Sequence, residues 1–259
     1  MRLDPAVASS GVALIAREEV GSTNSEAMAL ARGGQRGPLW ITARGQSAGR
    51  GRRGRVWVSE PGNLYASLLL TDPAPPERAA ELSFVAALAV FDAVAALAPD
   101  ITSGLALKWP NDLLFEGKKL AGILIEGEGA AVVVGIGVNC AHHPKEAAFP
   151  AIDLAAAGVL VTVEGLFETL SAAMERRLAQ WNRSVGFHSI RTDWLERAAG
   201  LGGPLRVSLP EGEHAGQFET IDARGRLVLR RPDGAAEMIA AGEVFALSAT
   251  SPRRAAVER

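Results

Sequence analysis

Glycine and arginine alternate through residues 46–57, where the order is Gln-Ser-Ala-Gly-Arg-Gly-Arg-Arg-Gly-Arg-Val-Trp. Glycine lets a backbone adopt positive φ and approach a ligand closely, and arginine supplies a permanently charged fork that suits carboxylate and phosphate. No acidic residue lies between Glu26 and Glu60, an interval that holds seven arginines. Because the whole chain has a net charge of −2, this positive charge is local, and we expect it to hold an anionic ligand.

Three interpretations of this segment compete: a solvated flexible loop, a nucleic-acid patch and a phosphate-binding loop for a small molecule. Residues 49–54 match G-x-G-x-x-G literally. A dinucleotide fingerprint needs a strand before the glycines and a helix after them, whereas residues 56–58 predict a strand and 61–63 a turn. Asp72 lies near the offset of the ribose-binding acid, but it opens a proline-rich stretch. We therefore reject a Rossmann fold and retain the anion site.

Other motifs place polar groups at the ends of apolar strands. Lys-Trp-Pro-Asn-Asp at 108–112 predicts a loop with charged tips, and Lys119 begins the next strand. Gly-Ile-Gly-Val-Asn at 135–139 ends an apolar strand with Asn139, and glycine inside such a strand often marks close approach by a ligand or another backbone. This set suits electrostatic stabilisation of a phosphate.

Several of these residues could instead have purely structural roles. Trp57 and Trp109 could be core aromatics, and Asp112 could pair with Lys108 across a turn. No Ser–His–Asp pattern accompanies the four histidines, and His142-His143 has no cysteine or acid at zinc spacing. Cys140 is more readily a buried, inert thiol than a nucleophile.

Short strands and helices must position these motifs. Hydrophobic periodicity predicts strands at 11–16, 39–43, 64–70, 105–107, 113–115, 118–126 and 131–139, and helices at 27–32, 77–97, 162–184 and 190–199. Thr23 and Glu26 have the spacing of a capping box. A helix beginning there would present free N–H groups beside Ser22, Thr23 and Asn24, which could bind a polar ligand or serve as caps alone.

Length and composition bound the class of protein. With 259 residues, 48% of them hydrophobic, the chain is expected to form one domain over 1–202, a small β module over 203–250 and a flexible tail over 251–259. The β module has predicted strands at 205–209, 216–221, 226–231 and 244–247. The balance of 27 basic and 29 acidic residues argues against a nucleic-acid coat. No signal peptide is recognised and the longest apolar run, 84–91, is too short to span a bilayer, so we expect a soluble cytoplasmic protein.

Four motifs, in this order, resemble those of the biotin–protein ligases: Gly-Arg-Gly-Arg-Arg-Gly-Arg-x-Trp, Lys-Trp-Pro-Asn-Asp, Gly-Lys-Lys-Leu-Ala-Gly-Ile-Leu-Ile-Glu and Gly-Ile-Gly-Val-Asn. The resemblance extends from about Ser22 through the C-terminal module. It implies an α+β fold, with a class II aminoacyl-tRNA-synthetase-like catalytic domain of mixed sheet and helices followed by a small SH3-like β-barrel. Because only about 20 residues precede Ser22, the resemblance is to the monofunctional type without the N-terminal repressor domain, and no DNA binding is expected.

The resemblance also implies a two-step reaction with ATP and biotin as substrates and Mg²⁺. The carboxylate of biotin attacks the α-phosphate, giving biotinyl-5′-AMP and pyrophosphate, and a lysine of the biotin carboxyl carrier protein then attacks this anhydride. Lipoate–protein ligases and octanoyltransferases share the architecture and are the alternative. We expect no membrane partner, and a monomer or a homodimer.

Carried over position by position, the resemblance assigns roles to individual residues. The catalytic residues would be Lys119, Arg52 and Asp112, and Asp112 could also hold magnesium. Biotin would be bound by Ser22, Thr23, Asn24, Gln46, Arg50, Gly51, Arg52, Lys119, Gly122 and Gly137. ATP would be bound by Arg50, Arg52, Arg55, Trp57, Lys119 and Asn139. With Gly135, the glycines of the two strands would leave room for the bicyclic ring and valeryl chain.

Overall fold

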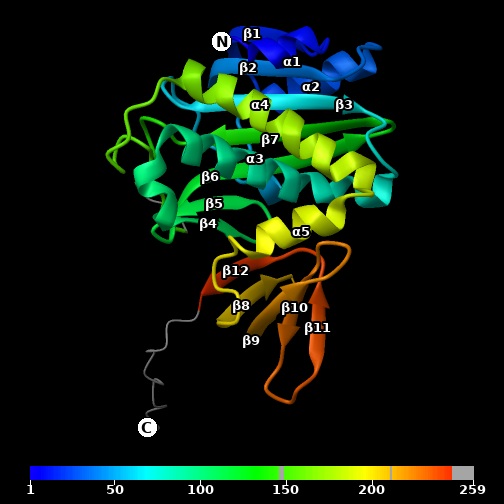
Figure 1. Ribbon diagram of the computed structural model, residues 1–259, viewed down its shortest axis with the longest axis vertical. Coiled ribbons are helices and arrows are strands. Elements are labelled where there is room, and N and C mark those ends of the chain that lie inside the picture. Colours follow the sequence, from blue (N-terminus) through cyan, green and yellow to red (C-terminus); the bar gives the residue numbers. More distant parts are fainter. Residues whose placement is uncertain (146–148, 211, 247–259) are drawn as a thin grey trace, which may run out of the picture. The chain divides into compact units, whose positions relative to one another are not determined.

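A computed structural model describes residues 1–145, 149–210 and 212–246 (Figure 1). The chain divides into two compact units. The first comprises Met1–Ala199 with Ala223–Gly225, and the second comprises Gly200–Asp222 and the chain from Arg226 onward. The expected tail at 251–259 lies outside the described residues, as does the last residue of the strand predicted at 244–247.

A seven-stranded mixed sheet forms the centre of the first unit (Figure 1). Across the sheet the order is β1 (Ala13–Val20), β2 (Leu39–Gln46), β3 (Leu64–Thr71), β7 (Ala131–Val138), β6 (Lys118–Glu128), β5 (Asp112–Phe115) and β4 (Leu105–Lys108). The β1–β2 pair is parallel and the other neighbours are antiparallel. β3 is buried along almost its whole length, which agrees with its apolar residues on both faces.

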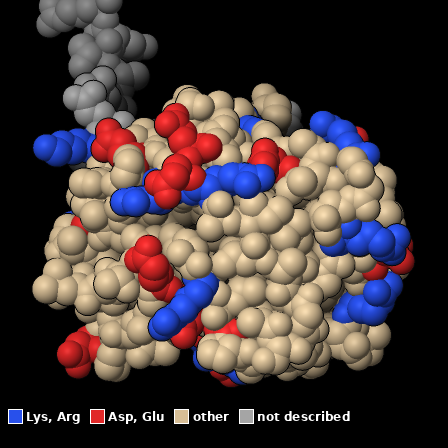
Figure 2. All heavy atoms as spheres, turned by 90° about the horizontal axis from the view of Figure 1, so that it is seen from above, with Lys and Arg blue, Asp and Glu red and all other residues tan. Residues whose placement is uncertain are grey.

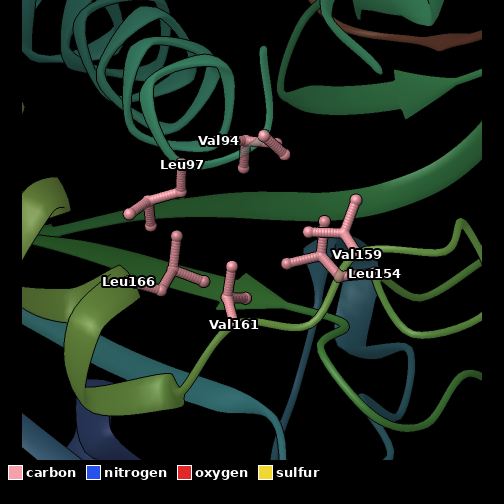
Figure 3. Close-up of a pocket in the computed structure, with 7 residues that line it drawn as sticks. Val94, Leu97, Leu154, Val159, Val161 and Leu166 are labelled. Atoms are coloured by element: carbon pink, nitrogen blue, oxygen red, sulfur yellow. The ribbon is translucent and has the colours of Figure 1, made fainter. Parts of the chain in front are cut away.

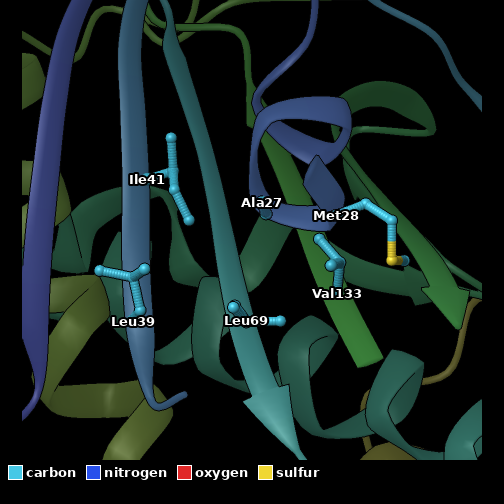
Figure 4. Packing of buried hydrophobic residues seen from close by; sticks show 6 residues of the cluster. All are labelled: Ala27, Met28, Leu39, Ile41, Leu69 and Val133. Atoms are coloured by element: carbon cyan, nitrogen blue, oxygen red, sulfur yellow. The ribbon is translucent and has the colours of Figure 1, made fainter. Parts of the chain in front are cut away.

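Helices cover both faces of this sheet. α2 (Thr23–Arg32) packs one face through a cluster shown in Figure 4, namely Ala27, Met28, Leu39, Ile41, Leu69 and Val133. Alternation along β2 turns Trp40 to the opposite face, where its ring lies 5.4 Å from that of Phe167 on α4 (Val163–Trp181). The sheet is therefore a central layer between α2 and the helices of the other face.

The predicted helix at 77–97 has two parts. Pro76–Glu81 forms 3-10 turns, and the α-helix α3 covers Leu82–Leu97. Within the described residues, the stretch Pro76–Leu97 is the one helical segment long and apolar enough to cross a membrane, but 72% of its most apolar window is buried inside the protein. The helix is longer than the uninterrupted apolar run at 84–91, which Asp92 ends, because the residues on both sides of that run are also largely apolar. Its burial identifies α3 as a core helix.

Other boundaries differ in instructive ways. Thr162, at the start of the helix predicted at 162–184, caps α4, its hydroxyl accepting from the Gly165 N–H at 3.1 Å. α5 (Phe187–Leu195) begins three residues before the predicted start. A short N-terminal helix, α1 (Pro5–Ser9), was not predicted. The strand predicted at 56–58 is absent from these described residues, where Val56 forms only an isolated bridge with Arg50.

The second unit is an antiparallel sheet. Its order is β11 (Ala236–Ile239), β10 (Leu227–Arg230), β9 (Gly212–Ile221), β8 (Pro204–Leu209) and β12 (Glu243–Ala246). Four of these strands were predicted. β11 was missed because its four residues, Ala-Glu-Met-Ile, alternate too briefly to stand out from the preceding turn.

Candidate active site

The start of α2 lies beside the end of β2. Ser22, Thr23 and Asn24 are buried there, and the parallel β1–β2 register places Gln46 opposite Val20 at the same edge. The Thr23 backbone N–H donates to Gln46 Oε1 at 2.8 Å. The residue that ends β2 and the residues that begin α2 thus share one polar site.

The predicted capping box does not form. Thr23 is the first helical residue and Ser22 occupies the N-cap position without a side-chain bond to the helix. Glu26 is turned outward, where its Oε1 lies 3.2 Å from Arg17 Nη2. The Thr23 hydroxyl is therefore directed into the protein instead of toward its own helix.

Two buried serines, not recognised in the sequence, complete this site. Ser67 on β3 lies 2.6 Å from Asn24 Oδ1 and 2.8 Å from the Thr23 hydroxyl. Since Oδ1 can only accept, Ser67 donates to Asn24. Ser59 accepts from Gln46 Nε2 at 2.9 Å. Ser67 could have been noticed as a polar residue inside an otherwise apolar strand, whereas Ser59 lies in the loop before β3.

We call this group the neutral cluster, and it comprises Ser22, Thr23, Asn24, Gln46, Ser59 and Ser67. Its hydrogen bonds connect α2, β2 and β3, together with the end of the glycine-arginine loop at Ser59. Ser59 in turn donates to the Trp57 carbonyl at 2.8 Å. A small polar ligand would meet a surface whose directions are already set.

The glycine-arginine loop is a tight excursion between β2 and β3. Its two limbs are joined by hydrogen bonds from the Trp57 N–H to the Gly49 carbonyl at 2.9 Å and from the Gly51 N–H to the Arg55 carbonyl at 2.7 Å. A Cβ on Gly49 would lie 2.4 Å from Ser59 Oγ, so only glycine fits. No helix of dinucleotide-fingerprint type follows these residues, which agrees with the rejection of a Rossmann fold.

Arg50 contacts the sheet. Its Nη2 lies 3.0 Å from Glu126 Oε2 and 3.1 Å from Oε1, and its Nη1 donates to the Ser25 hydroxyl at 2.6 Å. Glu126 lies near the end of β6 and also accepts from Asn24 Nδ2 at 2.7 Å. The first arginine of the loop is thereby linked to α2 and β6.

Charged residues gather on β5, β6 and the loop before β5. Lys119 Nζ lies 2.6 Å from Asp112 Oδ1, an ion pair without regular hydrogen-bond geometry, since this oxygen accepts no hydrogen bond. Arg52 Nη1 donates to Asn111 Oδ1 at 3.3 Å. We call these four residues, Arg52, Asn111, Asp112 and Lys119, the charged cluster.

A β-bulge directs Lys119 into this cluster. Asp112 pairs with Gly122, but the register shifts so that Leu114 lies opposite Lys119. In a regular ladder Lys119 and Gly122 would face opposite sides of the sheet; the extra residue brings them to the same side. A Cβ on Gly122 would indeed lie 3.1 Å from Lys119 Nζ.

Trp57 covers the glycines of β6 and β7. Gly122 and Gly137 are directly paired, and a Cβ on them would lie 3.0 Å and 2.7 Å from the indole ring. Lys119 Nζ is 5.4 Å from the centre of a Trp57 ring, and the buried indole Nε1 has no hydrogen-bond partner. The space expected over these two glycines is filled by Trp57, while a Cβ on Gly135 would lie 2.3 Å from Asn24 Oδ1.

Asn139 joins a later segment to β6. Its Nδ2 donates to the Ile152 carbonyl at 3.0 Å and lies 3.4 Å from the Lys119 carbonyl. The Lys119 N–H donates to the Pro150 carbonyl at 2.7 Å. The Asn139 side-chain amide nitrogen is thus directed at two backbone carbonyls. Its Oδ1 is the atom that could contact a nucleotide. Arg55 is exposed on the loop.

Other reactive residues do not form a second centre. Burial raises the pKa of Cys140 to about 11, so its thiol is protonated and unreactive near neutral pH. His143 Nδ1 lies 2.5 Å from Asp153 Oδ2. Over residues 1–145, 149–210 and 212–246, no group of three or more His, Cys, Asp or Glu side chains could hold a metal ion.

An apolar gap lies elsewhere in the first unit. Figure 3 shows its lining, with Val94 and Leu97 from α3, Leu154, Val159 and Val161 from the loop before α4, and Leu166 from α4. No polar group lines it, and the gap has no room for a water-sized ligand. It is a packing defect and carries no chemistry.

Basic side chains do not form a continuous surface on the face shown in Figure 2, where they lie beside acidic ones. Among the described residues, basic side chains are often paired with acidic ones, for example Arg32 with Glu128 and Arg17 with Glu26. A nucleic-acid-binding face would present one sign of charge. The loop arginines are better explained by a small anionic ligand at the two clusters.

Together the clusters can bind a ligand with one neutral polar end and one anionic end. The neutral cluster offers oriented amides and hydroxyls, and the charged cluster offers a lysine and an arginine that can stabilise a developing negative charge. No residue of either cluster is an activated nucleophile. The arrangement suits a reaction between two bound substrates.

Comparison with known proteins agrees with this chemistry. Residues 22–141 match the model of the biotin/lipoate A/B protein ligase family, and residues 200–247 match the biotin protein ligase C terminal domain. The chain is 45% identical over 235 residues to the biotin–[acetyl-CoA-carboxylase] ligase of Paracoccus denitrificans, covering 86% of this chain and 96% of that protein. It is 34% identical over 237 residues to the corresponding ligase of Mycobacterium tuberculosis, covering 88% and 87%.

Solved structures of biotin protein ligases resemble this chain as well. The biotin protein ligase from Aquifex aeolicus in complex with biotin and ATP matches with a TM-score of 0.79 and 26% identity, over 90% of this chain and 99% of that chain. The predicted fold class is confirmed: a class II aminoacyl-tRNA-synthetase-like unit of mixed sheet and helices, and an SH3-like antiparallel unit. The chain belongs to the biotin–protein ligase family.

Proposed function

We propose that this protein activates biotin with ATP to biotinyl-5′-AMP and transfers the biotinyl group to a lysine of a biotin carboxyl carrier protein. The observation that supports this most directly is the convergence of motifs from 22–24, 46–57, 111–112, 119–126 and 137–139 at two adjacent clusters. The family membership and the ligands of the Aquifex structure agree with it. Residues 1–202 would be the catalytic domain and residues 203–250 the SH3-like module.

In the first step, the neutral cluster would bind the ureido end of biotin. Ser22, Thr23, Asn24 and Gln46 supply amide and hydroxyl groups of the kind that a cyclic urea recognises. Orienting the substrate there holds its carboxylate toward the opposite end of the site, which lowers the entropic barrier to attack on ATP. The backbone of Arg50 and Gly51 would approach this carboxylate.

The charged cluster would stabilise the reacting phosphate. Lys119 and Arg52 would exchange their present partners, Asp112 and Asn111, for the carboxylate and α-phosphate oxygens as charge develops. Arg55 would assist the departure of pyrophosphate. Trp57 would offer its ring to adenine, and Asn139 Oδ1 would lie toward the base.

Magnesium would enter with ATP. Mg²⁺ in proteins is commonly held by one or two carboxylates together with substrate phosphates, and Asp112 is the carboxylate of the charged cluster. In the second step Asp112 would then orient the amine of the carrier lysine. The loop, closing over the mixed anhydride, would exclude water until the carrier arrives. We place this reaction in the cytoplasm.

A direct assay tests the proposal. The purified protein, MgATP, biotin and a carrier domain that a known biotin ligase labels should give a product detected by avidin. Calorimetry should show binding of biotin and none of lipoate at the same concentration. Absence of labelled carrier would contradict the ligase assignment, and preferential binding of lipoate would favour the related lipoate ligases.

A further inference from the structure

Glu126 closes the motif at 117–126, and the reaction outlined above gives it no role. It is nevertheless the point where two of the proposed substrate-binding residues meet. Its Oε2 accepts from Asn24 Nδ2 at 2.7 Å, and Arg50 Nη2 lies 3.0 Å from the same oxygen. Asn24 and Glu126 are separated by 102 positions in the chain, so only the fold brings them together.

The contacts of Asn24 leave it little freedom. Its Nδ2 is directed at Glu126 and, at 3.4 Å, at the Leu124 carbonyl, while its Oδ1 accepts from Ser67. An amide oxygen has two lone pairs, so Oδ1 retains one for a ligand. Without the Glu126 carboxylate the amide loses its strongest partner and its preferred orientation.

Arg50 depends on the same carboxylate. Its Nε and Nη2 both face Glu126, at 3.3 Å and 3.0 Å, and its Nη1 donates to Ser25. The side chains of Arg50 and Glu126 are about one third exposed, at 35% and 31%, so their attraction alone contributes little. The paired contacts between the Arg50 guanidinium and the Glu126 carboxylate fix the orientation of the arginine more than they add binding energy. They hold the first limb of the glycine-arginine loop beside α2.

We propose that Glu126 is a positioning residue for biotin: its carboxylate orients the Asn24 amide and anchors the loop at Arg50. This inference rests on the proposed function. Asn24 is on the biotin side of the site, and Arg50, which the resemblance assigns to biotin and ATP alike, would approach the biotin carboxylate with its backbone while its side chain contacts Glu126. Lys119 and Arg52, which would contact the reacting phosphate, have the separate partners Asp112 and Asn111.

A selective kinetic effect follows. Glu126→Gln keeps the side-chain shape but removes the charge and leaves one acceptor for two donors. We expect the KM for biotin in pyrophosphate exchange to rise about tenfold, as for the loss of a hydrogen bond to a charged group. The kcat should stay close to that of the wild type, and calorimetry should show the same loss of biotin affinity. The KM for ATP should rise less than the KM for biotin, because Arg50 alone of the two residues that Glu126 holds is assigned to ATP.

Glu128→Gln is the matched control. Glu128 lies two residues further along the same strand, and its Oε1 accepts from Arg32 Nε at 2.8 Å, away from the loop. The same loss of charge there should leave the KM for biotin unchanged. Glu126→Asp keeps the charge but is one methylene shorter, and its KM should fall between those of the wild type and Glu126→Gln; it carries the test if the Gln variant does not fold.

Three outcomes would overturn the inference: an unchanged KM for biotin in Glu126→Gln, an equal rise in Glu128→Gln, or a fall in kcat without a change in KM. If the wild type itself transfers no biotin, the proposed function fails. If the wild type and Glu128→Gln are active and Glu126→Gln is indistinguishable from them, only the role of Glu126 fails.

Discussion

The neutral cluster and the charged cluster lie side by side, yet they are built in opposite ways. In the neutral cluster, uncharged donors and acceptors are buried and bonded to one another, as with Ser67, Thr23 and Asn24. In the charged cluster, Lys119 and Arg52 are held by partners that a substrate could replace. A fixed polar surface favours recognition of one ligand, and exchangeable cations favour stabilisation of charge that appears only during reaction.

This difference makes distinct kinetic predictions for the two clusters. Changes in the charged cluster should lower kcat, because they act on the transition state, and changes in the neutral cluster should raise the KM for biotin. A charged-cluster variant that changes only the KM for biotin, or a neutral-cluster variant that changes only kcat, would contradict this comparison. The four variants below are ordered by the size of the expected effect.

Lys119→Ala should have the largest effect. Removing the cation that faces the developing charge is expected to lower kcat for adenylation about 10²- to 10³-fold, the usual cost of one such group. Pyrophosphate exchange measures this step. Lys118→Ala is the matched control, since Lys118 is the exposed preceding residue and should be dispensable. Near-normal exchange by Lys119→Ala would remove the lysine from the reaction.

Gly137→Ala should be the next most damaging. Its Cβ would lie 2.7 Å from the Trp57 ring, so the indole must shift, and overpacking of this kind is expected to reduce kcat/KM about ten- to a hundredfold. In Gly127→Ala the nearest atom is an ordinary 3.7 Å away, and activity should be retained. Equal activity in the two variants would show that the Trp57 position is not needed.

Ser67→Ala tests the neutral cluster with a smaller change. Loss of the hydroxyl leaves Asn24 Oδ1 buried without its donor, which costs about 1–3 kcal/mol and should raise the KM for biotin about tenfold. Ser171→Ala removes an equally buried hydroxyl from α4. It should lower the melting temperature but leave this KM unchanged. A fall in kcat for Ser67→Ala would contradict the proposed division.

Cys140 should have the smallest effect, because it belongs to neither cluster. Cys140→Ala should retain near-normal activity, and iodoacetamide should not inactivate the native protein at neutral pH. The pKa of the thiol is raised from 9.0 to about 11 by burial, so the folded state retains its proton where the unfolded state loses it. This contribution to stability is complete below pH 9 and is lost as the pH rises toward 11. Inactivation by iodoacetamide at pH 7 would indicate a reactive thiol.

Local patterns in the sequence were sufficient to predict most strands and the glycine-arginine loop. Periodicity located every strand of the first sheet except its exact ends, and glycines with arginines marked the loop that we propose binds an anion. Local pattern also failed in identifiable places. Residues 56–58 have a strand-like composition, but Val56 has only a single bridge partner. Thr23 and Glu26 have capping-box spacing, but the buried partners Ser67 and Gln46 attract the Thr23 hydroxyl instead.

Two of the residues that were missed, Ser67 and Glu126, have partners that are distant in the chain. Ser67 and Glu126 have ordinary sequence surroundings, and nothing local connects them with Asn24. Their roles depend on which strands are neighbours, and the order β3-β7-β6 could not be obtained from periodicity. Whether Trp57 or a ligand occupies the space above Gly122 and Gly137 is likewise a question of packing.

The sequence by itself determined the chemical groups and their family, because residue types and short spacings are local properties. The tertiary structure decided how those groups face one another. Lys119 is the clearest case: alternation along β6 would place it on the side of the sheet away from Gly122, and the bulge opposite Leu113 and Leu114 brings it to Asp112. A bulge depends on the register between two strands, and that register is set by the packing of the whole sheet.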